Sequence, residues 1–174
     1  MQTKDPDLIL IGLGANLPGA AGSPRQTLAA ALECMAAKNL VVTRRSRFWR
    51  TRPVPISDQP WFVNAVAAVE TELSADALLE MLHGIEDSFG RTRTVLNAAR
   101  ILDLDLLAYG RQILATPPRP LVPHPRLAER AFVLLPLRDI APDWSHPESG
   151  ESLDLLISKL EGDQGCHPEE DACD

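Results

Sequence analysis

The sequence predicts an α+β fold of the ferredoxin-like βαββαβ type, a single domain in which helices pack on one face of an antiparallel sheet. Three observations support this prediction: a length of 174 residues, an apolar content of 45%, and short apolar strands that alternate with two amphipathic helical segments. A chain of this length has room for one substantial core. Its composition excludes wholly disordered and collagen-like chains.

The first half of this unit contains two strands and a helix. Residues 8–13 form a continuous apolar run followed by a glycine, which is typical of a buried strand that enters a loop. Residues 23–26 read Ser-Pro-Arg-Gln, the order of a capping box with proline in the first turn, so we expect a helix to begin there. Residues 40–49 are expected to form the second strand.

The second half repeats this order of strand, helix and strand. Residues 62–71 are predicted to form a strand, Ser74 to cap a helix that ends near Gly90, and residues 101–109 to form the last strand. A short hairpin partner is expected after Gly110. Two more helices are predicted after the βαββαβ unit, over residues 132–140, with a proline near the start, and over residues 152–160.

The net charge of −7 is concentrated at the C-terminus. Residues 161–174 contain six acidic residues and no Lys or Arg; removing six from the 24 acids leaves 18 against 17 bases, a nearly neutral body. We expect a domain over residues 1–160 and a disordered acidic tail over residues 161–174. A neutral body does not favour a nucleic-acid partner. No apolar run is long enough for a bilayer span or a secretory signal, so we expect a cytoplasmic protein without a membrane partner.

Two acidic residues alternate with leucine in the last predicted strand. Successive side chains of a strand point to opposite faces, so Asp103 and Asp105 share one face, with Cα atoms roughly 7 Å apart. Two like charges repel each other in this position unless a cation lies between them. Carboxylates together with substrate phosphates are the usual ligands of Mg²⁺, so the pair indicates a metal site; the alternative is a solvated strand face.

Basic residues flank this strand in the sequence. Arg91, Arg93 and Arg100 precede it, and His124 and Arg130 follow in a proline-rich stretch. Such residues either form ordinary surface ion pairs or bind a polyphosphate whose other oxygens contact the metal. The familiar phosphate loops are absent because the sequence contains no Gly-Lys pair and no GxGxxG motif. A nucleotide would therefore be bound by arginine and metal.

Several ordered motifs, spread from residue 8 to residue 160, together resemble one family, 6-hydroxymethyl-7,8-dihydropterin pyrophosphokinase. The motifs are Gly12-Leu-Gly-Ala-Asn16, Arg50-Thr-Arg-Pro53, Asp58-Gln-Pro-Trp-Phe-Val-Asn64, Ile85-Glu86 with Gly90-Arg-Thr-Arg93, Arg100-Ile-Leu-Asp-Leu-Asp105, Val122-Pro-His-Pro125 and Arg130-Ala-Phe132. The resemblance implies a monomeric, Mg²⁺-dependent transferase of folate biosynthesis. It would transfer pyrophosphate from ATP to the hydroxymethyl group of the reduced pterin and release AMP.

The resemblance also implies a role for each matching residue. The metal ligands for two Mg²⁺ ions would be Asp103 and Asp105, which with Arg91 and Arg100 form the expected catalytic set. The expected ATP-binding residues are His83, Glu86, Arg93, His124 and Arg130. The expected pterin-binding residues are Thr51, Val54, Phe62, Asn64 and Phe132. A flat heteroaromatic ring favours aromatic faces on both sides and an amide partner at its edge, which suits this last set.

Two other functions remain possible from the residues alone. An Asp-x-Asp strand also suits a two-metal nucleotidyltransferase that attacks the α-phosphorus, and such an enzyme releases pyrophosphate in place of AMP. A ferredoxin-like sheet also serves as a non-catalytic binding module, for RNA in particular. Product analysis separates the first alternative, and RNA binding that survives Mg²⁺ chelation would indicate the second.

Overall fold

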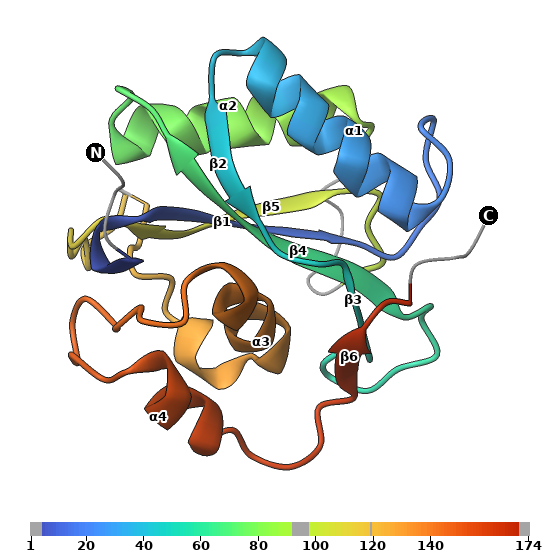
Figure 1. Cartoon of the computed structure of the whole chain (residues 1–174). Coiled ribbons are helices and arrows are strands. Elements are labelled where there is room, and N and C mark those ends of the chain that lie inside the picture. Colours follow the sequence, from blue (N-terminus) through green and yellow to red (C-terminus); the bar gives the residue numbers. More distant parts are fainter. Residues whose placement is uncertain (1–4, 92–97, 119, 171–174) are drawn as a thin grey trace.

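The chain folds into one antiparallel sheet with helices on both of its faces (Figure 1). This computed structural model describes residues 5–91, 98–118 and 120–170. The strands are β1 (Ile9–Ala15), β2 (Val41–Arg45), β3 (Trp49–Thr51), β4 (Phe62–Glu70), β5 (Asp103–Tyr109) and β6 (Cys166–Pro168). The helices are α1 (Pro24–Ala37), α2 (Ala75–Ser88), α3 (Ala131–Ile140) and α4 (Leu153–Ser158), with short 3-10 turns η1 (Asp5–Asp7) and η2 (Leu127–Glu129). None of the helices in the described ranges is long and apolar enough to cross a membrane.

The sheet has the order β5-β1-β4-β3-β6, and β2 pairs with the other half of β4. The predicted strand over residues 40–49 is therefore two strands. The register of its pairing with β4 changes between Ser46 and Trp49. The Ser46 N–H donates to the Val66 carbonyl at 2.9 Å, whereas Trp49 pairs with Asn64. Two residues then stand opposite one residue of β4, which is a bulge. The hairpin partner of β5 expected after Gly110 is not present within the described residues; Leu114 instead forms an isolated bridge with Val122.

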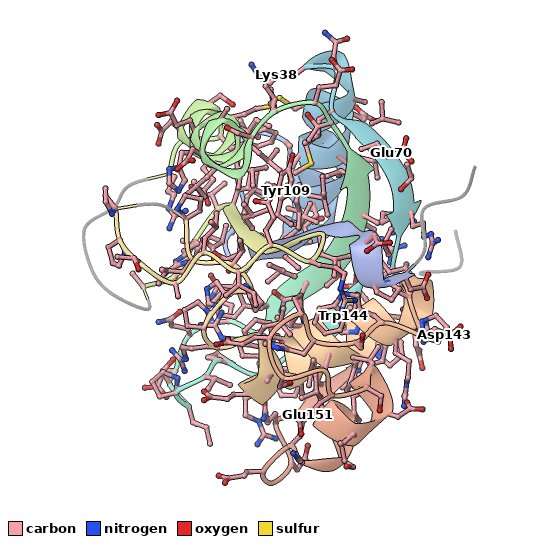
Figure 2. All side chains as sticks on the ribbon, turned by 90° about the vertical axis from the view of Figure 1, so that its left-hand side faces the viewer. Lys38, Glu70, Tyr109, Asp143, Trp144 and Glu151 are labelled. Carbon is pink, nitrogen blue, oxygen red and sulfur yellow. The ribbon has the colours of Figure 1, made fainter. Side chains whose placement is uncertain are left out.

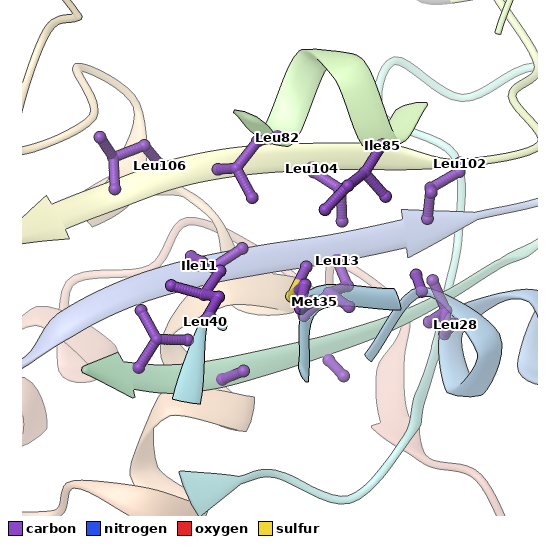
Figure 3. Packing of buried hydrophobic residues seen from close by; sticks show 14 of the residues in the cluster. Ile11, Leu13, Leu28, Met35, Leu40, Leu82, Ile85, Leu102, Leu104 and Leu106 are labelled. Carbon is purple, nitrogen blue, oxygen red and sulfur yellow. The ribbon is translucent and has the colours of Figure 1, made fainter. Parts of the chain in front are cut away.

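The fold class is confirmed, and the two helices of the βαββαβ unit share one face as expected. A capping box at Ser23 starts α1, and the Ser74 hydroxyl caps α2. Leu102, just before β5, and Leu104 and Leu106 of β5 enter the core beneath these helices (Figure 3).

The opposite face of the sheet is covered by α3 and α4, so the expectation of helices on one face only is wrong for the part of the chain after β5. Leu10 and Val66 of the sheet pack there with Leu134 and Leu137 of α3. Trp144, labelled in Figure 2, is fully buried in this second core. Pro136 lies in the interior of α3, not near its start, because the helix begins at Ala131.

The expectation of a disordered tail is wrong for residues 161–170. Residues 166–168 form β6, which pairs antiparallel with β3 at the edge of the sheet (Figure 1). The acidic composition suggested a solvated segment, but the backbone groups of β3 offer hydrogen-bond partners that composition does not reveal. Residues 171–174 lie outside the described part of the chain.

Candidate active site

The acidic pair lies on the sheet face that looks toward the start of α3. Asp103 pairs with Gly14 of β1, and Asp105 pairs with Gly12. Because paired residues project to the same face, the two carboxylates stand beside two positions that have no side chain. Leu104 and Leu106 point to the α1 and α2 side, and Leu107 packs in the second core on the α3 side. The alternation of side chains along β5 that the sequence predicted thus puts core leucines on one face of the sheet and the two carboxylates on the other.

A buried amide continues this row across the sheet. Asn64 of β4 pairs with Gly14, and its Nδ2 donates a hydrogen bond of 2.6 Å to the Thr51 hydroxyl. A Cβ atom on Gly14 would lie 2.6 Å from the Asn64 Oδ1, so only glycine leaves room for the amide in this rotamer. The row Asp103–Gly14–Asn64 therefore places an acidic group and an amide on the two sides of an open strip of backbone.

Asp103 is held by two arginines. The Arg100 Nη1 lies 2.6 Å from Asp103 Oδ2, and the Arg91 Nη1 lies 3.1 Å from Asp103 Oδ1. Arg91 also pairs with Glu86, whose side chain is completely buried. The Glu86 Oε1 accepts a 2.7 Å hydrogen bond from the Leu104 N–H. This carboxylate thus joins α2 to β5 and fixes Arg91 behind Asp103.

Glu86 is buried beneath the pocket wall and is not exposed to a ligand. Burial raises the pKa of Glu86, and the Leu104 N–H and the Arg91 charge oppose that rise. Its contacts suit a group that orients Arg91.

Asp105 has weaker counterions than Asp103. The Arg130 Nη1 lies 3.9 Å from Asp105 Oδ2, and 36% of the Asp105 side chain remains accessible through the pocket. Burial in this concave site, followed by the charge of Asp103, raises the pKa of Asp105 to about 7. A cation placed here would stabilise the ionised form.

His124 lies opposite the acids in the neutral form. Its Nδ1 accepts a 3.1 Å hydrogen bond from the Arg126 N–H, which leaves Nε2 as the donor. Burial and the charge of Arg130 lower the pKa of His124 to about 4. Its backbone N–H donates to the Leu107 carbonyl at 2.8 Å and so fixes the proline-rich segment against β5. His124 can therefore offer a hydrogen bond to an anion without carrying a charge.

These groups surround one pocket of about 540 Å³. Ten residues of the expected site line it: Thr51, Val54, Phe62, Asn64, Arg100, Asp103, Asp105, His124, Arg130 and Phe132. Three others do not line the pocket: Arg91 and Glu86 lie behind it, and His83 is half-buried on α2. Arg93 lies outside the described residues.

Among the functional residues that sequence reasoning missed are two arginines that line the pocket, Arg52 and Arg126, and the buried amide of Asn16. The Asn16 Oδ1 accepts from the Arg100 N–H at 2.8 Å, and its Nδ2 donates to Gln59 Oε1 at 3.2 Å and to the Pro60 carbonyl at 3.0 Å. The Asn16 side chain thus connects Arg100, in the segment that leads into β5, with the loop before β4. Its position after an apolar strand was the available signal, because a buried amide needs partners.

The site fits a metal that is shared with a substrate. No group of three or more His, Cys, Asp or Glu side chains within residues 5–91, 98–118 and 120–170 would hold an ion by itself. Mg²⁺ is commonly bound by one or two carboxylates together with phosphate oxygens, which is what Asp103 and Asp105 offer beside Arg100. The other half of the pocket, with Phe62, Asn64 and Phe132, suits a flat aromatic ligand with an amide edge.

Comparisons with known proteins show which family the chain is similar to. A family model described as 7,8-dihydro-6-hydroxymethylpterin-pyrophosphokinase (HPPK) matches residues 10–142. The 2-amino-4-hydroxy-6-hydroxymethyldihydropteridine pyrophosphokinase of Methylorubrum extorquens is 40% identical over 153 residues, which cover 87% of this chain and 92% of the relative. The protein of the same description from Pseudomonas aeruginosa is 41% identical over 153 residues, which cover 86% and 90%.

Two longer proteins match only in part. The chain is 37% identical to the folic acid synthesis protein fol1 of Pneumocystis carinii over 156 residues, 90% of this chain but 20% of that protein. A crystal structure of Plasmodium falciparum HPPK-DHPS superposes with a TM-score of 0.66 at 15% identity and covers 87% of this chain and 44% of the other. This structural likeness concerns the fold.

Proposed function

The chain belongs to the 7,8-dihydro-6-hydroxymethylpterin-pyrophosphokinase family, and from this premise we propose that its pocket transfers pyrophosphate from ATP to 6-hydroxymethyl-7,8-dihydropterin in folate biosynthesis. The products are AMP and the pterin diphosphate. One observation carries the proposal: the row Asp103–Gly14–Asn64 puts a phosphate-side acid and a pterin-side amide on either side of a bare strip in one pocket. That strip leaves room for the reacting atoms.

The pterin occupies the half of the pocket between β4 and α3. Its ring stacks between Phe62 and Phe132, and its amide edge bonds to Asn64. Thr51 supports this contact because its hydroxyl accepts from the Asn64 Nδ2 and so fixes which way the amide faces. Val54 adds an apolar wall in the loop after β3. The hydroxymethyl group then points along the glycine strip toward the acids.

The triphosphate of ATP occupies the half near β5. Asp103 and Asp105 would hold two Mg²⁺ ions, and these ions would supply neutralisation of the phosphate charge and polarisation of the transferred group. Arg100 and Arg130 then contact phosphate oxygens, and the neutral His124 donates a hydrogen bond from Nε2. Arg100 and Arg130 also lie 2.6 Å and 3.9 Å from oxygens of Asp103 and Asp105, so the basic and acidic groups reach the same phosphates from adjacent positions.

The reaction needs no covalent intermediate on the protein. The pterin hydroxyl oxygen forms a bond to the β-phosphorus, the bond from that phosphorus to the AMP oxygen breaks, and the hydroxyl proton is released. The protein aligns the oxygen, spreads the developing charge and limits the access of water. Arg91 acts by positioning Asp103, since it lies between Glu86 and that acid. Arg93 and His83 remain predictions as ATP contacts.

We expect the enzyme to be monomeric. The decisive experiment incubates the protein with ATP, Mg²⁺ and hydroxymethyldihydropterin and separates the products by chromatography. AMP and pterin diphosphate in equal amounts are expected, and chelation of Mg²⁺ should abolish both. Release of pyrophosphate with a nucleotidylated pterin would indicate nucleotidyl transfer, and release of ADP would indicate transfer of a single phosphoryl group. Either result would overturn the proposal.

A further inference from the structure

The segment after α4 returns to the substrate pocket. Residues 164–169, here called the C-terminal strap, include β6 and lie beside β3 (Figure 1). Cys166 pairs with Thr51, the residue that supports the Asn64 amide. The pairing is extended at both ends, because the Arg52 N–H donates to the Gly165 carbonyl at 3.1 Å and the Glu169 N–H donates to the Phe48 carbonyl at 2.8 Å.

The strap also caps the helix that carries Phe132. Arg130 is the N-cap residue of α3 and makes no side-chain cap hydrogen bond, although its guanidinium lines the pocket. Gln164 supplies the missing cap: its Oε1 accepts from the Ala131 N–H at 3.0 Å. Its Nε2 donates to the Glu129 carbonyl at 3.0 Å. An arginine side chain has no acceptor with which to cap a helix, so a residue 33 positions away in sequence supplies the cap for α3.

The strap contacts the pocket rim at a third place. Gly165 has φ +60°, and a Cβ built there would lie 3.1 Å from both the Cβ and the Nε of Arg52. The Arg52 guanidinium lies 5.6 Å from the centre of the Trp61 ring, which in turn lies 5.8 Å from the His167 ring. Arg52 is a lining residue of the pocket, so the strap and Trp61 together fix one side of its rim.

We propose that the C-terminal strap positions the two walls between which the pterin binds, with Gln164 and Gly165 as positioning residues. This inference rests on the proposed function, because it names the pterin as the ligand. The strap reaches one wall through Thr51 and Arg52 and the other through the first turn of α3, which holds Phe132. Asp103 and Arg100 of the triphosphate half are fixed by Arg91 and Asn16, which the strap does not contact within the described residues.

The chain offers a matched control for the glycine. Gly162 has φ +64°, nearly the value of Gly165, but no atom lies within 4 Å of a Cβ built there. Gly165→Ala and Gly162→Ala therefore introduce the same backbone strain, and only the first presses on Arg52. Gln164→Ala removes both hydrogen bonds to the start of α3. Gln164→Glu keeps the acceptor for the Ala131 N–H and loses the donor to Glu129.

The test measures the dissociation constant of hydroxymethyldihydropterin by calorimetry in the full chain, with a non-hydrolysable ATP analogue present, and separately that of the analogue. Gly165→Ala is expected to weaken pterin binding about five- to tenfold and analogue binding less than about twofold, because the added methyl group presses on Arg52. Gln164→Ala is expected to weaken pterin binding by a similar factor, the loss typical of one or two hydrogen bonds, and its effect on the analogue reports on Arg130, which lies between the two residues that Gln164 contacts. Gly162→Ala should stay near wild type, and Gln164→Glu, which keeps the bond to Ala131, should lose less than Gln164→Ala.

Thermal unfolding of each variant shows whether it folds, and Gly165→Ala carries the test if Gln164→Ala does not. Unchanged pterin affinity in a folded Gln164→Ala or Gly165→Ala variant overturns the inference, as does an equal loss in Gly162→Ala. A wild-type chain that binds the analogue but no pterin overturns the proposed function, and with it the role of the strap. Pterin binding by the wild type with unaffected variants overturns the strap alone.

Discussion

Gly14 of β1 stands directly opposite Asn64 of β4, and a methyl group on Gly14 would lie 2.6 Å from the Asn64 Oδ1. The amide is also tied to Thr51, so it must rotate or break that bond to make room. Gly14→Ala should therefore weaken pterin binding about tenfold, the cost of one mispaired buried amide. Isothermal titration with hydroxymethyldihydropterin measures this loss.

Gly12→Ala is the matched control for this substitution. A Cβ on Gly12 would lie 3.4 Å from the Leu107 methyl groups, an ordinary contact with a flexible side chain. Its pterin affinity should stay within about twofold of the wild type. Equal losses of pterin affinity in the two variants would show that the effect does not come from contact with Asn64.

Asp103→Asn and Asp105→Asn should each lower kcat by at least about a hundredfold, because each removes a carboxylate from the phosphate half of the pocket. Their stabilities should change in opposite directions. Asp103→Asn leaves Arg91 and Arg100 without their shared counterion, whereas Asp105→Asn removes a charge whose nearest arginine is 3.9 Å away. Calorimetry should show Tm shifts of about 2–4 °C, downward and upward respectively. Shifts of the same sign would contradict this account of the pair.

The pH dependence of stability should carry the signature of Asp105. Its pKa is about 7 in the folded chain and lies near 3.8 when unperturbed, so between these values the folded state binds a proton that the unfolded state has released. Stability therefore falls as pH rises from about 4 to 7 through this group. Asp105→Asn removes the effect, and its advantage over wild type should reach the order of 1 kcal/mol at pH 8 after allowance for water in the pocket.

Urea unfolding of both proteins at pH 5 and pH 8 measures this difference. His124 works in the other direction, because its pKa is lowered to about 4 in the folded chain. The unfolded state then takes up a proton between pH 6.5 and 4, and stability is lost as the pH falls. His124 is common to both proteins, so it cancels in the comparison. An advantage of Asp105→Asn that is as large at pH 5 as at pH 8 would rule out titration of this carboxyl.

Asn16→Ala should destabilise the chain by about 1–3 kcal/mol, because it leaves the Arg100 N–H and the Pro60 carbonyl without a partner. It should also lower kcat/KM for the pterin about tenfold, since the loop before β4 and the residue before β5 lose their common anchor. Gln59→Ala removes only one of these bonds and should have the smaller effect on both quantities. Chemical denaturation and initial rates measure them, and a larger effect of Gln59→Ala would refute the anchor.

Local patterns were sufficient for the parts of the fold that depend on neighbours in sequence. The Ser-Pro-Arg-Gln stretch at residues 23–26 predicted the start of α1, and the alternation in β5 predicted that Asp103 and Asp105 share a face. The sequence of β4 also indicated that helices would cover both faces of the sheet, an indication that the prediction did not use. Nearly every residue of β4 is buried, from Val63 to Val69, and a strand that is apolar on both sides needs a layer on each.

The contacts that were missed join residues far apart in the chain. Asn16 and Gln59 are separated by 43 positions, and Gln164 and Ala131 by 33, so no periodicity or spacing connects them. Composition was misleading in the acidic tail, where backbone pairing with β3 decides the structure and side-chain charge does not. The half of the pocket that contains Asp103, Asp105 and Arg100 was predictable because its expected chemistry needs particular residue types. The rim was not, because backbone groups and one distant glutamine build it.

The last strand also determines where the sheet stops. Without β6, the outward N–H and C=O groups of Trp49–Thr51 would lie open, and an open strand edge recruits strands from other molecules. The replacement edge is only three residues long and ends in Pro168, which has no N–H to donate. Chains that end before β6 should therefore self-associate at high concentration. On this account the C-terminal segment protects the protein from aggregation.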